Sequence, residues 1–180
     1  MEILLIVLLP LIVWAVVIYN KLIQDKNRVL QSWSDIDVQL KRRHDLIPKL
    51  VTAVNAYADY ESATLNELTA LRSRADGMQQ PGEKAQAENV LGGRIRQLIA
   101  VAEAYPDLKA NRQYLDLLHQ LSDVENHIQY ARRYYNGSVR NLNVRIDSFP
   151  DLLIARLFHF RPAEFFELES VLETDPPETR

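Results

Sequence analysis

The stretch Ile3–Tyr19 reads ILLIVLLPLIVWAVVIY and contains no charged residue. It is slightly shorter than the ~20 residues that cross a bilayer as a helix. Because it is apolar on every face, it differs from a helix that buries a single stripe in a core. Trp14 and Tyr19 fall near one end, where aromatic side chains favour the membrane–water boundary, and Lys21 follows. We expect residues 1–20 to form a transmembrane anchor.

Two other interpretations of this stretch are a cleaved signal peptide and a buried core helix. A signal peptide favours a basic start and small residues at a cleavage site. Here Glu2 is the charged residue ahead of the run, and no such small-residue pattern follows. Pro10 interrupts the run, so neighbours or water must satisfy the carbonyl that it frees.

The orientation of the anchor is predicted from the basic residues beside it. Lys21, Lys26 and Arg28 follow the run, and no Lys or Arg precedes it. Because basic flanks stay on the cytoplasmic side, we expect a cytoplasmic C-terminal domain on a bacterial inner membrane. A periplasmic domain is the alternative, because the N-terminal flank is very short.

The composition favours helices and disfavours several function classes. The 180 residues carry a net charge of −3, five glycines and no cysteine. A nucleic-acid partner is not expected, since it requires a basic surface. Disulfides and thiolate metal sites are excluded. Good helix formers dominate and strand-like alternation is scarce, so the sequence predicts an all-α fold.

Apolar residues recur at helical spacing in four stretches, which we expect to be helices ending near Arg43, Arg74, Ala104 and Asp147. The loop 76–82 and Pro106 separate the last three. The inward stripes are expected to be Val29, Trp33, Ile36 and Leu40; Leu46, Leu50, Val54, Tyr57, Leu65, Leu68 and Leu71; Val90, Leu91, Ile95, Leu98 and Val101; and Leu117, Leu121, Val124, Ile128, Ala131, Tyr135, Val139, Leu142 and Ile146.

An antiparallel up-down-up-down bundle over residues 21–148 follows if the chain reverses near His44. Asp45 would then cap the second helix, with Pro48 in its first turn. A continuous, kinked helix from the anchor to Arg74 is the alternative, because no glycine marks the reversal.

The C-terminal part has two segments of different character. Residues 149–167 are apolar and aromatic, with Arg156 and Arg161 interspersed. They either cap the open end of the bundle or contact lipid or a neighbouring subunit. The candidates for this interface are Phe149, Leu153, Leu157, Phe158 and Phe160. Residues 168–180 are acidic, contain Pro176-Pro177 and are expected to be disordered.

Three parts of the chain resemble the signatures of the LemA family. The first is Trp33–Pro48, WSDIDVQLKRRHDLIP, and the second is Ala131–Asn136, ARRYYN. The third comprises Asn143, Ile146, Phe149-Pro150, Ile154-Ala155 and Phe165-Phe166-Glu167. The resemblance covers about residues 19–169. It implies a bacterial membrane protein with one N-terminal span and a helical bundle, and no established biochemical activity; one relative is associated with magnetosome membranes.

Asp116, His119, Asp123 and His127 form the sharpest candidate for a metal site. Their spacing places them on one helix face, and such groups bind metals inside bundles. This face lies about 120° from the apolar stripe at ~100° per residue, so a solvated face is the favoured interpretation. No metal or other cofactor is expected.

Two further polar groups have structural explanations. His44 beside Asp45 resembles a base with its orienting group, but a turn residue and a helix cap explain them without chemistry. Asp35 and Asp37 are two apart and face different directions on a helix.

Glu61 falls within an apolar stripe, so its carboxylate needs a partner. We expect an ion pair with Arg132 or Arg133, with Glu125 nearby, that sets the helix register as a coiled-coil polar layer does. A proton or ligand role is the lesser possibility.

These patterns favour a non-catalytic, single-pass membrane-anchored scaffold or assembly protein. Its expected partners are the lipid bilayer and either further copies of itself or another membrane protein. A membrane-remodelling or lipid-sensing module is the alternative, because of residues 149–166. A metal-dependent bundle enzyme is a remote third possibility, resting on the histidine face.

Overall fold

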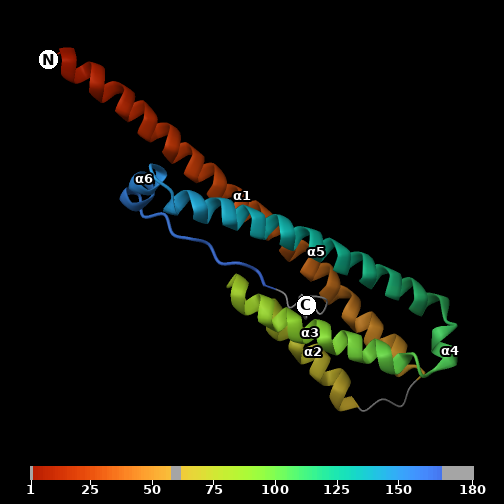
Figure 1. Cartoon of the computed structure of the whole chain (residues 1–180). Coiled ribbons are helices and arrows are strands. Elements are labelled where there is room, and N and C mark those ends of the chain that lie inside the picture. The colour runs from red at the N-terminus through yellow and green to blue at the C-terminus, as the bar shows by residue number, and fades with distance from the viewer. Residues whose placement is uncertain (1, 58–61, 168–180) are drawn as a thin grey trace, which may run out of the picture. The chain divides into compact units, whose positions relative to one another are not determined.

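The computed structural model describes residues 2–57 and 62–167 (Figure 1). This part of the chain contains six α-helices. They are α1 (Glu2–Asn55), α2 (Ser62–Asp76), α3 (Pro81–Ala102), α4 (Pro106–Lys109), α5 (Arg112–Asp147) and α6 (Asp151–Leu157). No strand occurs among these residues. The all-α fold with a long apolar N-terminal helix is thus confirmed.

The chain divides into two units, and both α1 and α5 take part in each. Unit 1 consists of Met1–Leu40 and Asn126–Phe165, and unit 2 of Lys41–Glu125 and Phe166–Arg180. Unit 1 therefore holds the first part of α1, the last part of α5, and α6. Unit 2 holds the end of α1, α2, α3, α4 and the start of α5.

The predicted reversal near His44 is wrong, because α1 continues unbroken to Asn55. Asp45 therefore lies inside a helix and caps nothing, and Pro48 lies inside the same helix rather than in a first turn. The continuous alternative is also wrong in its length, since α1 ends at Asn55 and a separate α2 begins at Ser62. Residues 58–61 lie outside the described part.

Within unit 2, α2 returns along the end of α1. Asp45 of α1 faces Arg72 near the end of α2 at 3.9 Å, while the last turn of α1 adjoins the start of α2 in sequence. The helix α3 then returns along α2, where Arg94 pairs with Glu67 at 2.9 Å. Each helix in this series is antiparallel to the one before it.

The start of α5 is fixed by a side-chain cap. The Oδ1 atom of Asn111 accepts hydrogen bonds from the backbone N–H groups of Gln113 (2.8 Å) and Tyr114 (3.3 Å). These N–H groups have no partner within the helix, so the cap stabilises its first turn. The predicted fourth helix is thereby divided into the single turn α4 and the long α5.

The predicted apolar stripes are largely confirmed. The α5 stripe from Leu117 to Ile146 is buried, with Ala131 half-buried, and so are Val29, Ile36 and Leu40 of α1. Two positions are wrong, since Val90 and Tyr57 are exposed, and the side chain of Leu65 lies outside the described part. The α3 stripe runs instead through Glu88, Leu91, Ile95 and Leu98.

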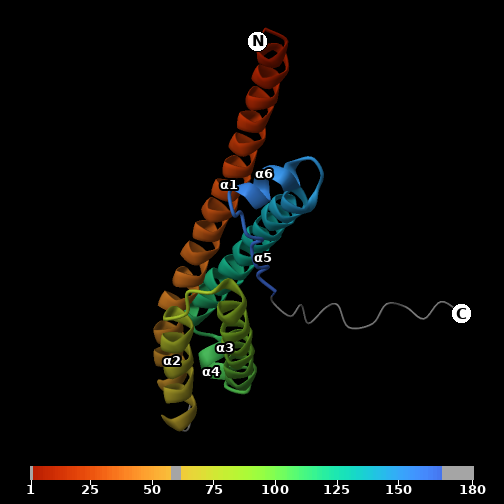
Figure 2. The ribbon, with the colours of Figure 1, turned by 90° about the vertical axis from the view of Figure 1, so that its left-hand side faces the viewer.

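The first part of α1 stands apart from the other helices of unit 1 (Figures 1 and 2). From Leu8 to Val17 its large apolar side chains are exposed. Ile18 is the first buried apolar residue after them, and Leu22 is fully buried. In the described part of the chain, α1 alone is long and apolar enough to cross a membrane. Packing within unit 1 thus begins where the apolar stretch ends.

Candidate functional site

The polar residues singled out in the sequence lie in different places. Glu61 lies outside the described residues, so its expected pairing with Arg132 or Arg133 stays a prediction. Arg132 is half-buried, and Arg133 is exposed with its guanidinium 4.8 Å from the centre of the Tyr130 ring.

The histidine face of α5 points to solvent. Asp116, His119, Asp123 and His127 are all exposed. Among the residues that the structure describes, no group of three or more His, Cys, Asp or Glu side chains is placed to hold a metal ion. The four side chains show no convergence toward one point that would favour ligation.

A buried ionic cluster occupies the interior of unit 2, formed by Arg43 and His44 of α1 and Glu88 of α3. Arg43 donates through Nη2 to the Glu88 carboxylate, and its Nη2 also lies 3.3 Å from the Glu88 carbonyl oxygen. The other carboxylate oxygen is 2.8 Å from His44 Nε2. All three side chains are at most 3% exposed, so the turn position expected for His44 is wrong.

Two carboxylates reach this cluster from more exposed positions. Glu125 of α5 accepts a hydrogen bond from Arg43 Nη1 at 3.1 Å, and Asp76 at the end of α2 lies 3.6 Å from His44 Nδ1. The cluster therefore links all four main helices of unit 2. Within the described residues, Arg43 Nε and His44 Nδ1 are buried without a hydrogen-bond partner.

The ionisation of Glu88 is set by opposing effects. Burial disfavours its charged form and would raise its pKa, but the His44 hydrogen bond and the Arg43 charge outweigh burial. The pKa of Glu88 therefore lies below its usual 4.5, and the carboxylate is charged at neutral pH. A charged carboxylate between two donors is suited to holding helices in a fixed register.

The sequence contained a signal for this cluster. Arg43 continues the buried series Leu40, Arg43, Ile47, Leu50, with steps of three and four residues. Glu88 stands in the same way before Leu91 and Ile95. The criterion that singled out Glu61, a charge inside an apolar stripe, also applies to Arg43 and Glu88 once α1 is continuous.

In unit 1, side chains of α5 hold an extended segment that follows α6. The Asn143 amide both donates to the Ala163 carbonyl (2.9 Å) and accepts from the Ala163 N–H (2.8 Å). Tyr135 donates its hydroxyl to the Glu164 carbonyl at 2.8 Å. Burial, together with the Glu164 charge, raises the pKa of Tyr135 to about 12, so this donor is retained at physiological pH.

A second ionic group ties three elements of unit 1 together. Arg145 of α5 lies 2.6 Å from Asp25 of α1 and 3.2 Å from Asp151 at the start of α6. Asp25 is buried, whereas the Arg145 side chain is 31% exposed. This group fixes α6 against the part of α1 that follows the apolar stretch.

The apolar residues predicted for an interface lie on and around α6. Phe149, Leu153, Leu157 and Phe158 are exposed, while Phe160 is half-buried. Tyr19 contacts the last two, with ring centres 4.7 Å from Phe158 and 5.9 Å from Phe160. Their role in an interface stays a prediction.

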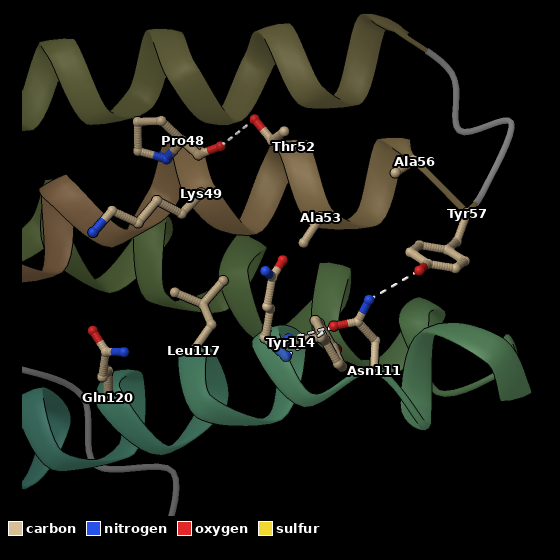
Figure 3. Close-up of a pocket in the computed structure, with 11 residues that line it drawn as sticks. Pro48, Lys49, Thr52, Ala53, Ala56, Tyr57, Asn111, Tyr114, Leu117 and Gln120 are labelled. Atoms are coloured by element: carbon tan, nitrogen blue, oxygen red, sulfur yellow. Dashed lines mark hydrogen bonds between the residues drawn. The ribbon is translucent and has the colours of Figure 1, made fainter.

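A cavity of about 630 Å³ lies in unit 2 between the end of α1 and the start of α5 (Figure 3). Pro48, Ala53 and Leu117 give it an apolar lining, and Asn111 donates to the Tyr57 hydroxyl at its edge (2.9 Å). Tyr114 is another lining residue, and its buried hydroxyl has no hydrogen-bond partner in the described part. The cavity has no cluster of charged or nucleophilic groups among these residues.

Comparison with known proteins relates the chain to one family. Residues 32–180 match the model of the LemA family. Over 161 residues the chain is 27% identical to Protein LemA of Metamycoplasma hominis, covering 87% of this chain and 72% of that protein. It is 28% identical over 81 residues to Magnetosome protein MamQ 2 of Paramagnetospirillum magneticum, covering 45% of this chain and 30% of that protein. It is 29% identical over 80 residues to Magnetosome protein MamQ of Magnetospirillum gryphiswaldense, covering 44% and 29%. The signature-like segments and the family match agree: the chain belongs to the LemA family.

Proposed function

We propose that this chain is a non-catalytic, single-pass membrane scaffold that α1 anchors and that associates with further copies of itself. The anchor is supported by the change in exposure of the apolar side chains along α1. Its apolar side chains are exposed from Leu8 to Val17, and burial begins at Ile18. A helix that exposes a continuous apolar surface of this kind is stabilised by a bilayer.

The same observation disfavours the two alternatives for this stretch. A core helix would be buried in its apolar part, and this part is exposed. A cleaved signal sequence would end at a flexible cleavage site, whereas Ile18 and Leu22 pack inside unit 1 without a break in α1. Lys21, Lys26 and Arg28 favour a bacterial inner membrane with units 1 and 2 in the cytoplasm, and a periplasmic location is the alternative.

Self-association is supported by an aromatic patch on α5. Tyr130 is 63% exposed and Tyr134, one turn later, 57% exposed. The exposed Arg133 lies over the Tyr130 ring. Tyrosine and arginine are enriched at the centres of protein interfaces, and exposed aromatic groups on one helix face favour a partner.

The test is the oligomeric state of the full chain in a mild detergent, measured by light scattering after size-exclusion chromatography. We expect an oligomer that the double substitution Tyr130→Ser with Tyr134→Ser dissociates. Arg140→Ala, at an exposed position of the same helix about 80–120° around the axis from the two tyrosines, is the control and leaves the oligomer intact. A monomer at all concentrations contradicts self-association, and co-purification of a membrane protein instead favours a heterologous partner.

A lipid-sensing module is the second candidate function, favoured by the exposed apolar residues around α6. It differs from the scaffold in its partner, since the bilayer itself is the ligand.

A further inference from the structure

We propose that α6 and its flanking residues form a second membrane contact that lies in the headgroup region beside the anchor. This surface, called here the α6 face, consists of Phe149, Leu153, Arg156, Leu157 and Phe158. The inference rests on the proposed anchoring by α1 and adds a specific lipid-binding surface to it.

An aromatic contact fixes the position of the α6 face along α1. Tyr19 stands directly after the exposed apolar stretch, at the height where tyrosine favours a membrane boundary. Its ring contacts Phe158 at 4.7 Å between centres. In a molecule anchored by α1, Phe158 therefore lies at the depth of the boundary, where lipid headgroups are the adjacent material.

The orientation of α6 is fixed by its packing and by an ionic linkage. Ile154 and Ala155 are buried and so direct the opposite side of this short helix outward. Arg145 joins Asp25 of α1 to Asp151 of α6. Asp25 lies six residues beyond Tyr19, which is about 9 Å along a helix, so this linkage also lies close to the boundary.

The end of α6 is held by a closing turn as well. The N–H of Phe160 bonds to the Ala155 carbonyl (2.9 Å), and the N–H of His159 to the Arg156 carbonyl (3.2 Å). His159 adopts a φ of 56°, the left-handed conformation that this type of helix ending requires. The turn brings Phe158 and Phe160 to the same ring of Tyr19.

The outward side of α6 combines large apolar side chains with arginines. Phe149 is 80% exposed, Leu157 66% and Leu153 54%. Arg156 on α6 and Arg161 after it are also exposed. Large apolar side chains with interspersed arginines are typical of helices that lie in a membrane interface, where the guanidinium groups meet lipid phosphates.

The cysteine-free sequence permits a direct test with single cysteines that carry an environment-sensitive fluorophore. Leu153→Cys and Leu157→Cys report on the α6 face, and both positions are exposed, so labelling leaves the packing intact. Val16→Cys reports on the anchor. The matched control is Val38→Cys, which is 51% exposed and lies on α1 in the same unit. Val38 is nineteen residues, or about 28 Å, beyond Tyr19 along α1.

The full chain is reconstituted into vesicles of phosphatidylcholine and phosphatidylglycerol that contain lipid with a nitroxide near the glycerol. We expect the nitroxide to remove most of the fluorescence at positions 153 and 157 and to leave the fluorescence at position 38 unchanged. Absence of quenching at 153 and 157 overturns the inference. A blue-shifted but unquenched signal there also overturns it, because protein from a second copy then covers the face.

The position 16 label separates this inference from the proposed function. Quenching at 16 without quenching at 153 and 157 leaves the anchor valid and rejects the α6 contact, whereas no quenching at 16 rejects both. Arg156→Glu with Arg161→Glu supplies a second measurement. We expect it to abolish the increase in quenching at 153 with phosphatidylglycerol content, while Arg140→Glu, an exposed site on α5, preserves that increase. A response that is the same in both variants contradicts a role for the two arginines.

Discussion

The two units are each held by an arginine between two carboxylates, but in different surroundings. In unit 2, Arg43 and Glu88 are almost completely inaccessible to water. In unit 1, Arg145 is 31% exposed while it joins Asp25 and Asp151. A buried pair lacks water as a substitute partner, so loss of one member leaves an uncompensated charge. At the partly exposed site, water replaces much of what is lost, and the group serves mainly to orient α6.

The largest effect is expected from Glu88→Ala. It leaves Arg43 buried without its principal partner, and the free energy of unfolding should fall by about 3–5 kcal/mol. Denaturant unfolding of the detergent-solubilised protein, followed by circular dichroism, measures the loss. The double substitution Arg43→Met with Glu88→Leu removes both charges and should recover most of the stability. If the single and double variants are equally unstable, packing rather than charge dominates at this site.

The contribution of Glu88 to the stability of the folded protein should depend on pH in the acid range. The pKa of Glu88 is lower in the folded protein than its usual 4.5, so the folded state binds this proton less readily than the unfolded state. The contribution of Glu88 is therefore fully present above about pH 5 and is lost as the pH falls through the folded pKa. Glu88→Gln should flatten the fall in melting temperature below that pH. Identical acid profiles for Glu88→Gln and the unmodified chain would place the responsible group elsewhere.

A smaller effect is expected from Arg145→Gln. Because the arginine is partly hydrated, we expect a loss of about 1–2 kcal/mol, with hydrogen bonds to Asp25 and Asp151 removed. The local consequence should exceed the global one, so hydrogen exchange should increase at α6 and remain unchanged in unit 2. Arg140→Gln is the exposed control on the same helix. Equal acceleration of exchange in both units would show that Arg145 supports the whole fold.

The smallest effect is expected from Tyr135→Phe. The change removes one hydrogen bond, to the Glu164 carbonyl, and keeps the ring that packs on Trp33. A neutral hydrogen bond of this kind contributes about 1 kcal/mol. Faster proteolysis after residue 160, with almost unchanged melting temperature, is the expected readout. A loss comparable to that of Glu88→Ala would contradict the contrast between the two units.

The sequence predicted the helices and their buried faces well where periodicity alone decides them. The α5 stripe from Leu117 to Ile146 is regular over its whole length, and its burial is confirmed. The sequence predicted the course of α1 poorly at His44, because Arg43, His44 and Asp45 have the polarity of a turn. Arg43 and His44 are buried as partners of Glu88, which stands more than forty residues later, so the place of Arg43 in an apolar series is apparent only when α1 is taken as continuous.

The sequence also did not indicate which side chains among residues 149–160 are buried and which are exposed. Most of these residues are apolar, and a seven-residue helix is too short for its periodicity to identify the buried face. The contact between Tyr19 and Phe158 joins the two chain segments that form unit 1, and it depends on the turn at His159. The α5 residues that hold the extended segment, Tyr135 and Asn143, were identified through family resemblance but not in this role.

The unbroken continuation of α1 from its apolar stretch into its packed part has a mechanical consequence. Because α1 is continuous, under the proposed anchoring any tilt of its apolar stretch is also a tilt of its packed part up to Leu40. The uncharged run Ile3–Tyr19 is about 25 Å long as a helix, which is shorter than a typical hydrocarbon core of ~30 Å. A thicker bilayer therefore favours an upright helix and local thinning, and a thinner one permits tilt. Unit 1 would then act as a lever whose inclination reports the thickness of the surrounding membrane.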